Sequence, residues 1–180
     1  NNSRIFLGGD LELSTKNKPL KDEFLDQIKE KFFLTEVIEF TSIIRADNEE
    51  SKTTRIKVVD DLYPLVGNVK VEPPNSFKLL QTKPNSILVD KVTKQNLDLK
   101  IGEKIKIQNI SLEIIGVIES LPDIPGFFLF GDQALISKPS FMNLQVNNLG
   151  SFINFKYKII NKDNNSILPA EISQNKKIVV

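Results

Sequence analysis

The sequence consists mainly of short apolar or alternating runs, each closed by proline, glycine or a polar turn. Alternation of apolar and polar residues over about four to eight positions is typical of half-buried strands. None of the runs approaches the roughly 18 apolar residues needed to cross a bilayer as a helix. Because strand-like runs greatly outnumber helical patterns, we predict an α+β fold with mixed, mostly antiparallel strands and a few short helices.

One segment, residues 19–33, has strong helical spacing. Its apolar residues recur every four positions and share one helix face: Leu20, Phe24, Ile28 and Phe32. Pro19 near the start suits a helix N-terminus, and so do Asp22 and Glu23 in the first turn, because acidic groups there oppose the helix dipole. The pattern predicts a helix that buries one face.

The remaining elements are predicted from period-two alternation and β-branched residues. We expect strands at 10–13, 37–46, 53–59, 68–72, 87–90, 104–107, 111–119, 133–137, 151–160 and 176–180, and short helices at 91–97 and 139–144. A helical turn could also form within 73–84. Strands 37–46 and 53–59 should form a hairpin. In the strand at 151–160 we place Phe152 on the same face as Phe155, Tyr157 and Ile159. Gly116, inside a strand, indicates a bulge or close packing.

Composition excludes several classes of function. The chain has 24 basic and 23 acidic residues, so a formal charge of +1 provides no net field to attract nucleic acid. It contains no His and no Cys, which removes most transition-metal sites, Cys nucleophiles and His-based triads. We therefore expect no catalytic residues, no metal site and no cofactor in this domain.

Carboxylates are the remaining candidates for catalysis. A small enzyme could use Asp10, Asp60 and Asp61, but only if the fold gathered them in one pocket that raised a pKa. The pair Asp60–Asp61 more simply caps the turn before Tyr63 and Pro64. We interpret Asp47, Glu49 and Glu50 as the solvated tip of the hairpin.

The most apolar stretch, Phe127–Phe130, lies between two glycines. It could be a core strand or, if exposed, a contact for lipid, a hydrophobic ligand or a partner protein. Candidate residues for such a partner or substrate contact are Phe127, Phe128, Phe130 and, in the loop around Pro64, Tyr63. Burial of this stretch would distinguish the two interpretations.

Several segments, in order, resemble one known family. They are Leu7–Leu13 (LGGDLEL), Val58–Gly67 (VVDDLYPLVG), Ile87–Asp90 (ILVD), Leu97–Ile107 (LDLKIGEKIKI), Ile115–Ile118 (IGVI) and Phe130–Ser137 (FGDQALIS). Together they resemble the MacB-like periplasmic core domain of ABC transporter permeases in the FtsX-like permease family, with the YbbP-type predicted permeases as the nearest subgroup. The resemblance runs from about Leu7 to Ile160.

The resemblance implies a single extracytoplasmic domain over residues 1–180, which could comprise two lobes with a β-rich lobe around 60–120. It implies a permease of the inner (cytoplasmic) membrane with this domain in the periplasm. Because the chain begins at Asn1 rather than Met, we expect it to be a piece of that larger protein, inserted between two membrane helices.

The family also implies partners. We expect an ABC ATPase subunit that acts through the membrane part, a second permease copy, and a hydrophobic or lipidated substrate or an extracytoplasmic protein. We expect no nucleic acid. The domain itself would not be catalytic, because ATP is hydrolysed on the ATPase subunits. The alternative is a free-standing extracytoplasmic binding or adhesion module.

Overall fold

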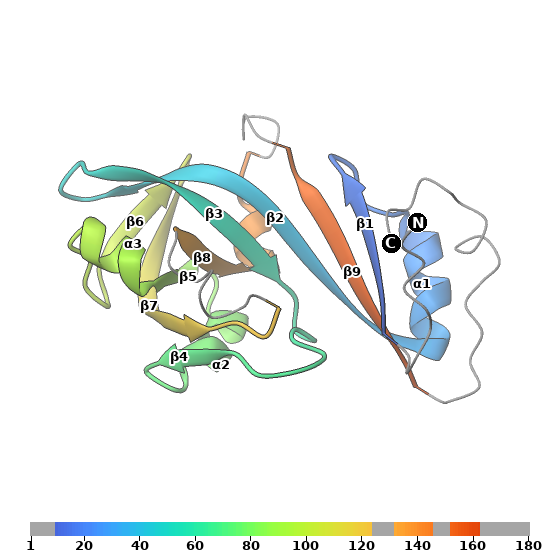
Figure 1. Ribbon diagram of the computed structural model, residues 1–180. Helices are drawn as coiled ribbons and strands as arrows, with labels where there is room; N and C mark the ends of the chain where they lie inside the picture. The colour runs from blue at the N-terminus through green and yellow to red at the C-terminus, as the bar shows by residue number, and fades with distance from the viewer. Residues whose placement is uncertain (1–9, 124–131, 146–151, 163–180) are drawn as a thin grey trace, which may run out of the picture.

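The computed structural model describes residues 10–123, 132–145 and 152–162, and has the predicted α+β fold (Figure 1). One mixed sheet of nine strands is accompanied by short helices. In chain order the elements are β1 Asp10–Lys16, α1 Asp22–Lys31, β2 Phe32–Ala46, β3 Ser51–Val59, β4 Lys70–Glu72, α2 Ser76–Thr82, β5 Ser86–Asp90, α3 Lys91–Asn96, β6 Lys104–Ile107, β7 Ile110–Ser120, β8 Gln133–Ser137, α4 Lys138–Met142 and β9 Asn154–Asn161. Among these described helices, none is long and apolar enough to span a membrane.

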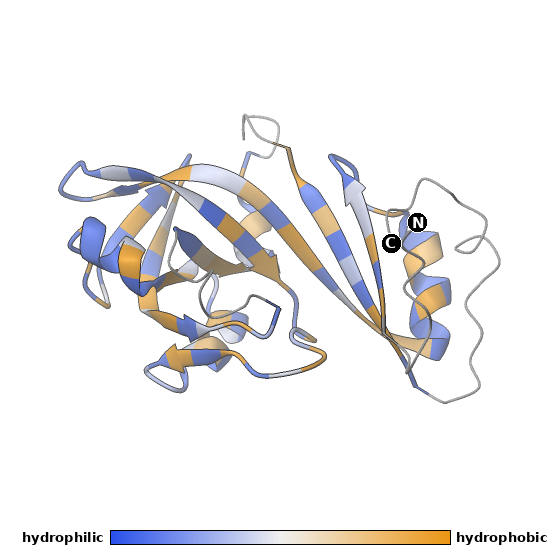
Figure 2. Ribbon diagram, viewed as in Figure 1, coloured by the Kyte–Doolittle hydropathy of each residue, from blue (hydrophilic) through white to orange (hydrophobic). Residues whose placement is uncertain are grey.

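The part of the sheet nearest the described chain ends consists of β1, β9 and the first half of β2. Asp10, the first residue of β1, pairs with Ile160 near the end of β9, so the start of β1 lies beside the end of β9. Residues alternate along these strands, as Figure 2 shows by colour. One face buries Leu13 and Tyr157 with Leu25 and Ile28 of α1 in a shared core. We call this region the chain-end sheet.

Apart from β4, which pairs with β7 outside the ring, the rest of the sheet closes on itself as a ring of six strands. The order is β2, β3, β8, β5 and β7, and β6 completes the ring because it pairs with both β7 and β2. Strand pairs β3–β8 and β5–β7 are parallel, and the other pairs described are antiparallel. This mixed but mostly antiparallel arrangement confirms the prediction.

Strands β5 and β8 of the ring are buried on both faces, which explains their continuous apolar runs, whereas β6 alternates between exposed and buried residues. In β5, Ile87 and Val89 belong to the main core, whereas Leu88 belongs to a second core on the opposite face. Leu80 of α2 and Tyr63 pack into this second core. At β5 both faces are therefore covered, one by the main core and one by the second core, to which α2 and the loop at 60–67 contribute.

Two details differ from expectation. The helix predicted to reach Phe33 ends at Lys31, because Phe32 and Phe33 begin β2 and pair with Asn161 and Ile160 of β9. Strand pairing here outweighs helical spacing. The placement of Phe152 with the buried residues of β9 was wrong: it is 74% exposed and Ile153 is buried instead, since neighbouring residues in an extended chain face opposite sides.

Gly116 was expected to mark a bulge or close packing, and both are confirmed. The β5–β7 register shifts there, with Ile87 opposite Ile114 and Leu88 opposite Gly116. A Cβ on Gly116 would lie 2.9 Å from the Glu72 carbonyl oxygen and would also collide with the Ser76 side chain. The predicted strand at 176–180 lies outside the described residues.

Candidate functional site

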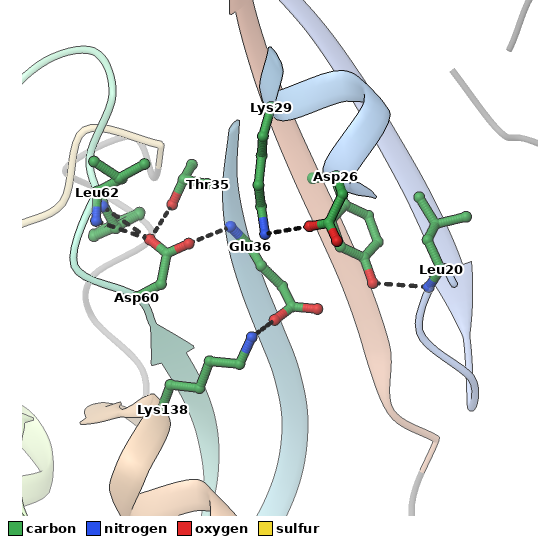
Figure 3. Close-up of polar contacts among 10 residues, drawn as sticks. Leu20, Asp26, Lys29, Thr35, Glu36, Asp60, Leu62 and Lys138 are labelled. Atoms are coloured by element: carbon green, nitrogen blue, oxygen red, sulfur yellow. Dashed lines mark hydrogen bonds and ion pairs between the residues drawn. The ribbon is translucent and has the colours of Figure 1, made fainter. Parts of the chain in front are cut away.

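Asp60 anchors the start of the loop at 60–67. Its carboxylate accepts hydrogen bonds from Thr35 Oγ1 at 2.5 Å, from the Glu36 amide at 2.7 Å, and from the amides of Leu62 and Tyr63, both at 3.1 Å (Figure 3). These bonds fix the loop to β2, and the carboxylate caps the turn, which confirms the capping interpretation for Asp60. Aspartate suits this position because one carboxylate can accept several bonds at once.

The hypothesis of a carboxylate enzyme loses its geometric basis. Asp60 is occupied by the four donors just described, Asp61 is exposed, and Asp10 belongs to the β1–β9 ladder. Neither Asp60 nor Asp61 lines the pocket described below. Asp47, Glu49 and Glu50 are exposed at the β2–β3 turn, as predicted for a solvated hairpin tip.

A second polar cluster lies on the other side of the same loop, and sequence reasoning missed it. Lys57 of β3 is only 2% exposed, and its Nζ donates to Asp123 Oδ2 at 2.5 Å. Glu39 lies 3.7 Å from the same Nζ. The Tyr63 hydroxyl donates to the other oxygen of Asp123 at 2.7 Å. Buried lysines are rare without a counter-ion, so Asp123 and Glu39 make this position possible.

Ionisation in this cluster follows from burial and charge. Burial alone would raise the pKa of Asp123, but the positive charge and hydrogen bond of Lys57, with the Tyr63 hydroxyl, outweigh it and lower that pKa below its ordinary value. Burial, and then the neighbouring Asp123 charge, raise the pKa of Tyr63 well above its ordinary value. At neutral pH Asp123 is therefore a carboxylate and Tyr63 a neutral phenol.

A pocket of about 140 Å³ lies beside this cluster, between the loop and the face of the chain-end sheet opposite α1. It is lined by Glu12, Thr35, Val37, Tyr63, Pro64, Leu65, Val66, Gly67, Pro122, Asp123, Lys156 and Lys158. Gly67 adopts φ +79° and packs against Pro122, since a Cβ there would lie 2.6 Å from the Pro122 Cβ. This contact holds the loop against the segment that carries Asp123.

The lining of the pocket combines apolar and charged groups. Val66 in this lining is 48% exposed. Lys156 is paired with Glu39 at 2.8 Å. Glu12 and Lys158 are register partners on β1 and β9 but form no ion pair with any described residue.

The opposite face of the chain-end sheet has its own polar contacts. Tyr157 accepts a hydrogen bond from the Leu20 amide at 2.9 Å, which fixes the approach to α1 (Figure 3). Burial raises the pKa of Tyr157. Glu36, 7% exposed, pairs with Lys138 at the start of α4. These contacts bind α1 and α4 to the shared strands.

Of the residues predicted as contacts, the structure places only Tyr63. It is 5% exposed, packs edge-on against Phe77, and reaches the surface only as part of the pocket wall. Phe127, Phe128 and Phe130 lie outside the described residues. Lys57, Asp123 and Lys158, which surround or line the pocket, were not predicted, because they become neighbours of the loop only through the fold.

Comparison with known proteins matches residues 2–166 to the family of MacB-like periplasmic core domains. A curated relative, the ABC transporter permease YbbP of Escherichia coli strain K12, is 26% identical over 121 residues. That match covers 67% of this chain but 14% of the relative, so the chain spans a small part of the relative's length.

Solved structures share the fold. The periplasmic region of MacB from Actinobacillus actinomycetemcomitans superposes with a TM-score of 0.57 at 14% identity, covering 92% of this chain and 80% of that one. A domain of a permease protein from Porphyromonas gingivalis gives 0.55 at 12% identity, with 89% and 78% covered. The extracellular domain of the ABC-type transporter YknZ from Gram-positive bacteria gives 0.50 at 11%, with 86% and 85% covered.

The matched family comprises domains of transporter permeases rather than known enzymes. The family match and the permease relative support an extracytoplasmic domain of an ABC-type permease. With 165 of its 180 residues inside the match (2 through 166), the chain belongs to the family of MacB-like periplasmic core domains.

Proposed function

We propose that this domain belongs to an ABC transporter permease subunit of the inner membrane and transmits ATP-driven motion to an extracytoplasmic substrate or partner. ATP is hydrolysed on separate ATPase subunits, which act through the membrane part, and two permease copies stand side by side. The substrate or partner is hydrophobic, lipidated or a protein. The observation that carries this proposal is the continuity of strand β2, which belongs to both the chain-end sheet and the ring.

Strand β2 connects the chain-end sheet to the ring without a break. Its residues Phe32–Glu39 pair with β9, and Val37–Arg45 pair with β3. Fifteen residues in a strand span roughly 50 Å at about 3.3 Å per residue. Because the two ladders overlap at Val37–Glu39, no flexible linker separates the two parts of the sheet.

The chain-end sheet is suited to attachment at the membrane. Its outer strand β1 starts at Asp10, directly opposite Ile160 of β9. The described chain therefore enters and leaves the sheet at neighbouring positions. Two membrane helices joined to these positions would move this end of the chain-end sheet, and β2 would transmit the movement to the ring. The near-neutral net charge of +1 supports a protein or apolar partner rather than nucleic acid.

Purification of the full-length protein from membranes tests the proposal. We expect an ABC ATPase subunit to co-purify in detergent, and native mass spectrometry to show two permease copies. The 180-residue chain alone, used as the control, should bind no ATPase subunit and should not hydrolyse magnesium ATP. Recovery of the full-length protein from the extracytoplasmic fraction, without an ATPase subunit, would contradict the proposal and support the free-standing binding module.

A further inference from the structure

The pocket beside the loop is too small for a typical small-molecule ligand. Sites for drug-sized ligands and cofactors usually enclose about 300–1,000 Å³, whereas this pocket encloses about 140 Å³. A volume of that order suits a single aliphatic or aromatic side chain. In many protein–protein interfaces, much of the binding free energy comes from one anchor side chain that fills a desolvated pocket.

The pocket's chemistry also suits an apolar side chain. Val37, Pro64, Leu65 and Val66 contribute apolar surface to its wall. Two of its charged residues are already neutralised, because Asp123 is bound by Lys57 and Lys156 by Glu39. A charged group entering the pocket would therefore find no vacant counter-ion at Asp123 or Lys156 and would lose part of its hydration.

Two further lining residues add recognition of charge. Glu12 and Lys158 lie on adjacent strands and form no ion pair with other described residues. They add one acidic and one basic group to the wall of the pocket. A peptide with a basic and an acidic residue on either side of its apolar residue is complementary to them.

We propose that this pocket anchors one aliphatic or aromatic side chain of an extracytoplasmic protein partner, from a peptide segment with oppositely charged residues on its two sides. Half-exposed Val66, which lines the pocket, forms its apolar rim. This inference rests on the proposed function only for the compartment in which the partner is found. The partner class is thereby narrowed to proteins, in preference to free lipid.

The test is the binding of short peptides to the 180-residue chain, monitored by heteronuclear NMR. Probes are acetyl-Glu-Leu-Lys-amide and acetyl-Glu-Phe-Lys-amide, with acetyl-Glu-Gly-Lys-amide as the matched control. We expect saturable shifts at Val37, Tyr63 and Val66 for the first two at millimolar concentration. The glycine peptide should bind about ten- to hundredfold more weakly, since it lacks the buried side chain.

Two variants locate the binding. Val37→Phe fills the pocket from its wall and should abolish saturable shifts. Because Val37 is buried and a larger side chain could disturb folding, Val66→Asp serves as the second variant. Val66 is half-exposed, so Val66→Asp should fold normally and weaken binding by introducing a charge at the rim. Ile43→Asp is the control, since Ile43 is 56% exposed on β2 and does not line the pocket.

The outcomes are distinct. Equal binding of the leucine and glycine peptides, or unchanged binding to folded Val66→Asp, would overturn the proposal. Tighter saturation of the same resonances by sodium octanoate than by either apolar peptide would overturn it in favour of an acyl-chain site. None of these measurements involves ATP or the ATPase subunit, so a failure here is separate from a failure of the proposed function.

Discussion

The two carboxylates that flank the loop at 60–67 are held in opposite ways. Asp60 is bound by one hydroxyl and three backbone amides, all neutral donors. Asp123 is bound by the ammonium of Lys57 and the phenol of Tyr63. The first arrangement caps a turn, whereas the second neutralises a lysine that is 2% exposed. Removal of a carboxylate therefore leaves either unsatisfied neutral donors or an unpaired buried charge, depending on the groups that bind it.

Loss of Asp60 would leave four neutral donors, of which the Leu62 amide lies where water can bind it. Loss of Asp123 would leave a buried ammonium with Glu39 at 3.7 Å as its remaining counter-ion. An uncompensated buried charge costs more than an unsatisfied neutral donor. We therefore expect the Asp123 cluster to be the more sensitive of the two.

The largest effect should follow Asp123→Ala. We expect it to lower the free energy of unfolding by about 3 kcal/mol, near the lower end for a broken buried pair, because Glu39 remains. Urea denaturation of the 180-residue chain measures this. In the Lys57→Met, Asp123→Ala double variant, which removes the buried charge as well, most of the stability should return. A double variant no more stable than Asp123→Ala would show that the buried ammonium is not the cause.

Asp60→Ala should have the next largest effect. It removes the acceptor for four donors, so we expect a loss of about 2 kcal/mol in urea denaturation. Asp61→Ala is the matched control at the neighbouring exposed position, where a change within about 0.5 kcal/mol is expected. If Asp60→Ala cost more than Asp123→Ala, the proposed difference between neutral and charged donors would be wrong.

Tyr63→Phe should cost less, about 1 kcal/mol, because it removes one hydrogen bond but keeps the ring in the second core. It should also raise the pKa of Asp123 toward its ordinary value, since the hydroxyl stabilises the charged carboxylate. Carboxyl carbon NMR titration measures that pKa. An unchanged pKa in Tyr63→Phe would show that Lys57 alone holds it down.

The smallest expected effect is the pH dependence of the Asp123 cluster. Because the folded-state pKa is lowered, the cluster contributes stability above the ordinary value of 3.8, and that contribution is lost as pH falls through the lower folded pKa. Urea denaturation of the parent chain and of Asp123→Asn, compared from neutral pH downward, isolates the contribution. The stability difference between them should shrink below pH 3.8; a constant difference would contradict the assignment.

Local patterns in the sequence predicted the Asp60 cap, because the loop amides it binds lie within three residues. They also predicted α1 and most strands, and the ordered motifs identified the family. Lys57 and Asp123 are 66 residues apart, so only the fold brings them together. Alternation along β3 could have suggested that Lys57 is exposed, yet a counter-ion from a distant loop lets it be buried.

The errors at Phe33 and Phe152 have a similar cause. Helical spacing favours continuing α1, but pairing of Phe33 with Ile160 requires the strand to begin there. Phe152 and Ile153 are both apolar, so composition could not decide which of them faces the core. The pocket was also beyond prediction, because its lining comes from β1, β2, β9, the loop at 60–67 and Pro122–Asp123.

The proposed function requires that the chain-end sheet and the ring move together as one rigid unit. Pulsed electron spin resonance on the full-length permease with its ATPase subunit tests it, with spin-labelled cysteines at exposed Asp26 of α1 and Lys100 near the ring. The 180 residues contain no native cysteine. We predict that ATP binding changes the Lys100–Lys100 distance between two permease copies while the Asp26–Lys100 distance within one copy stays constant. A constant distance between copies, or a changed distance within one, would contradict the account.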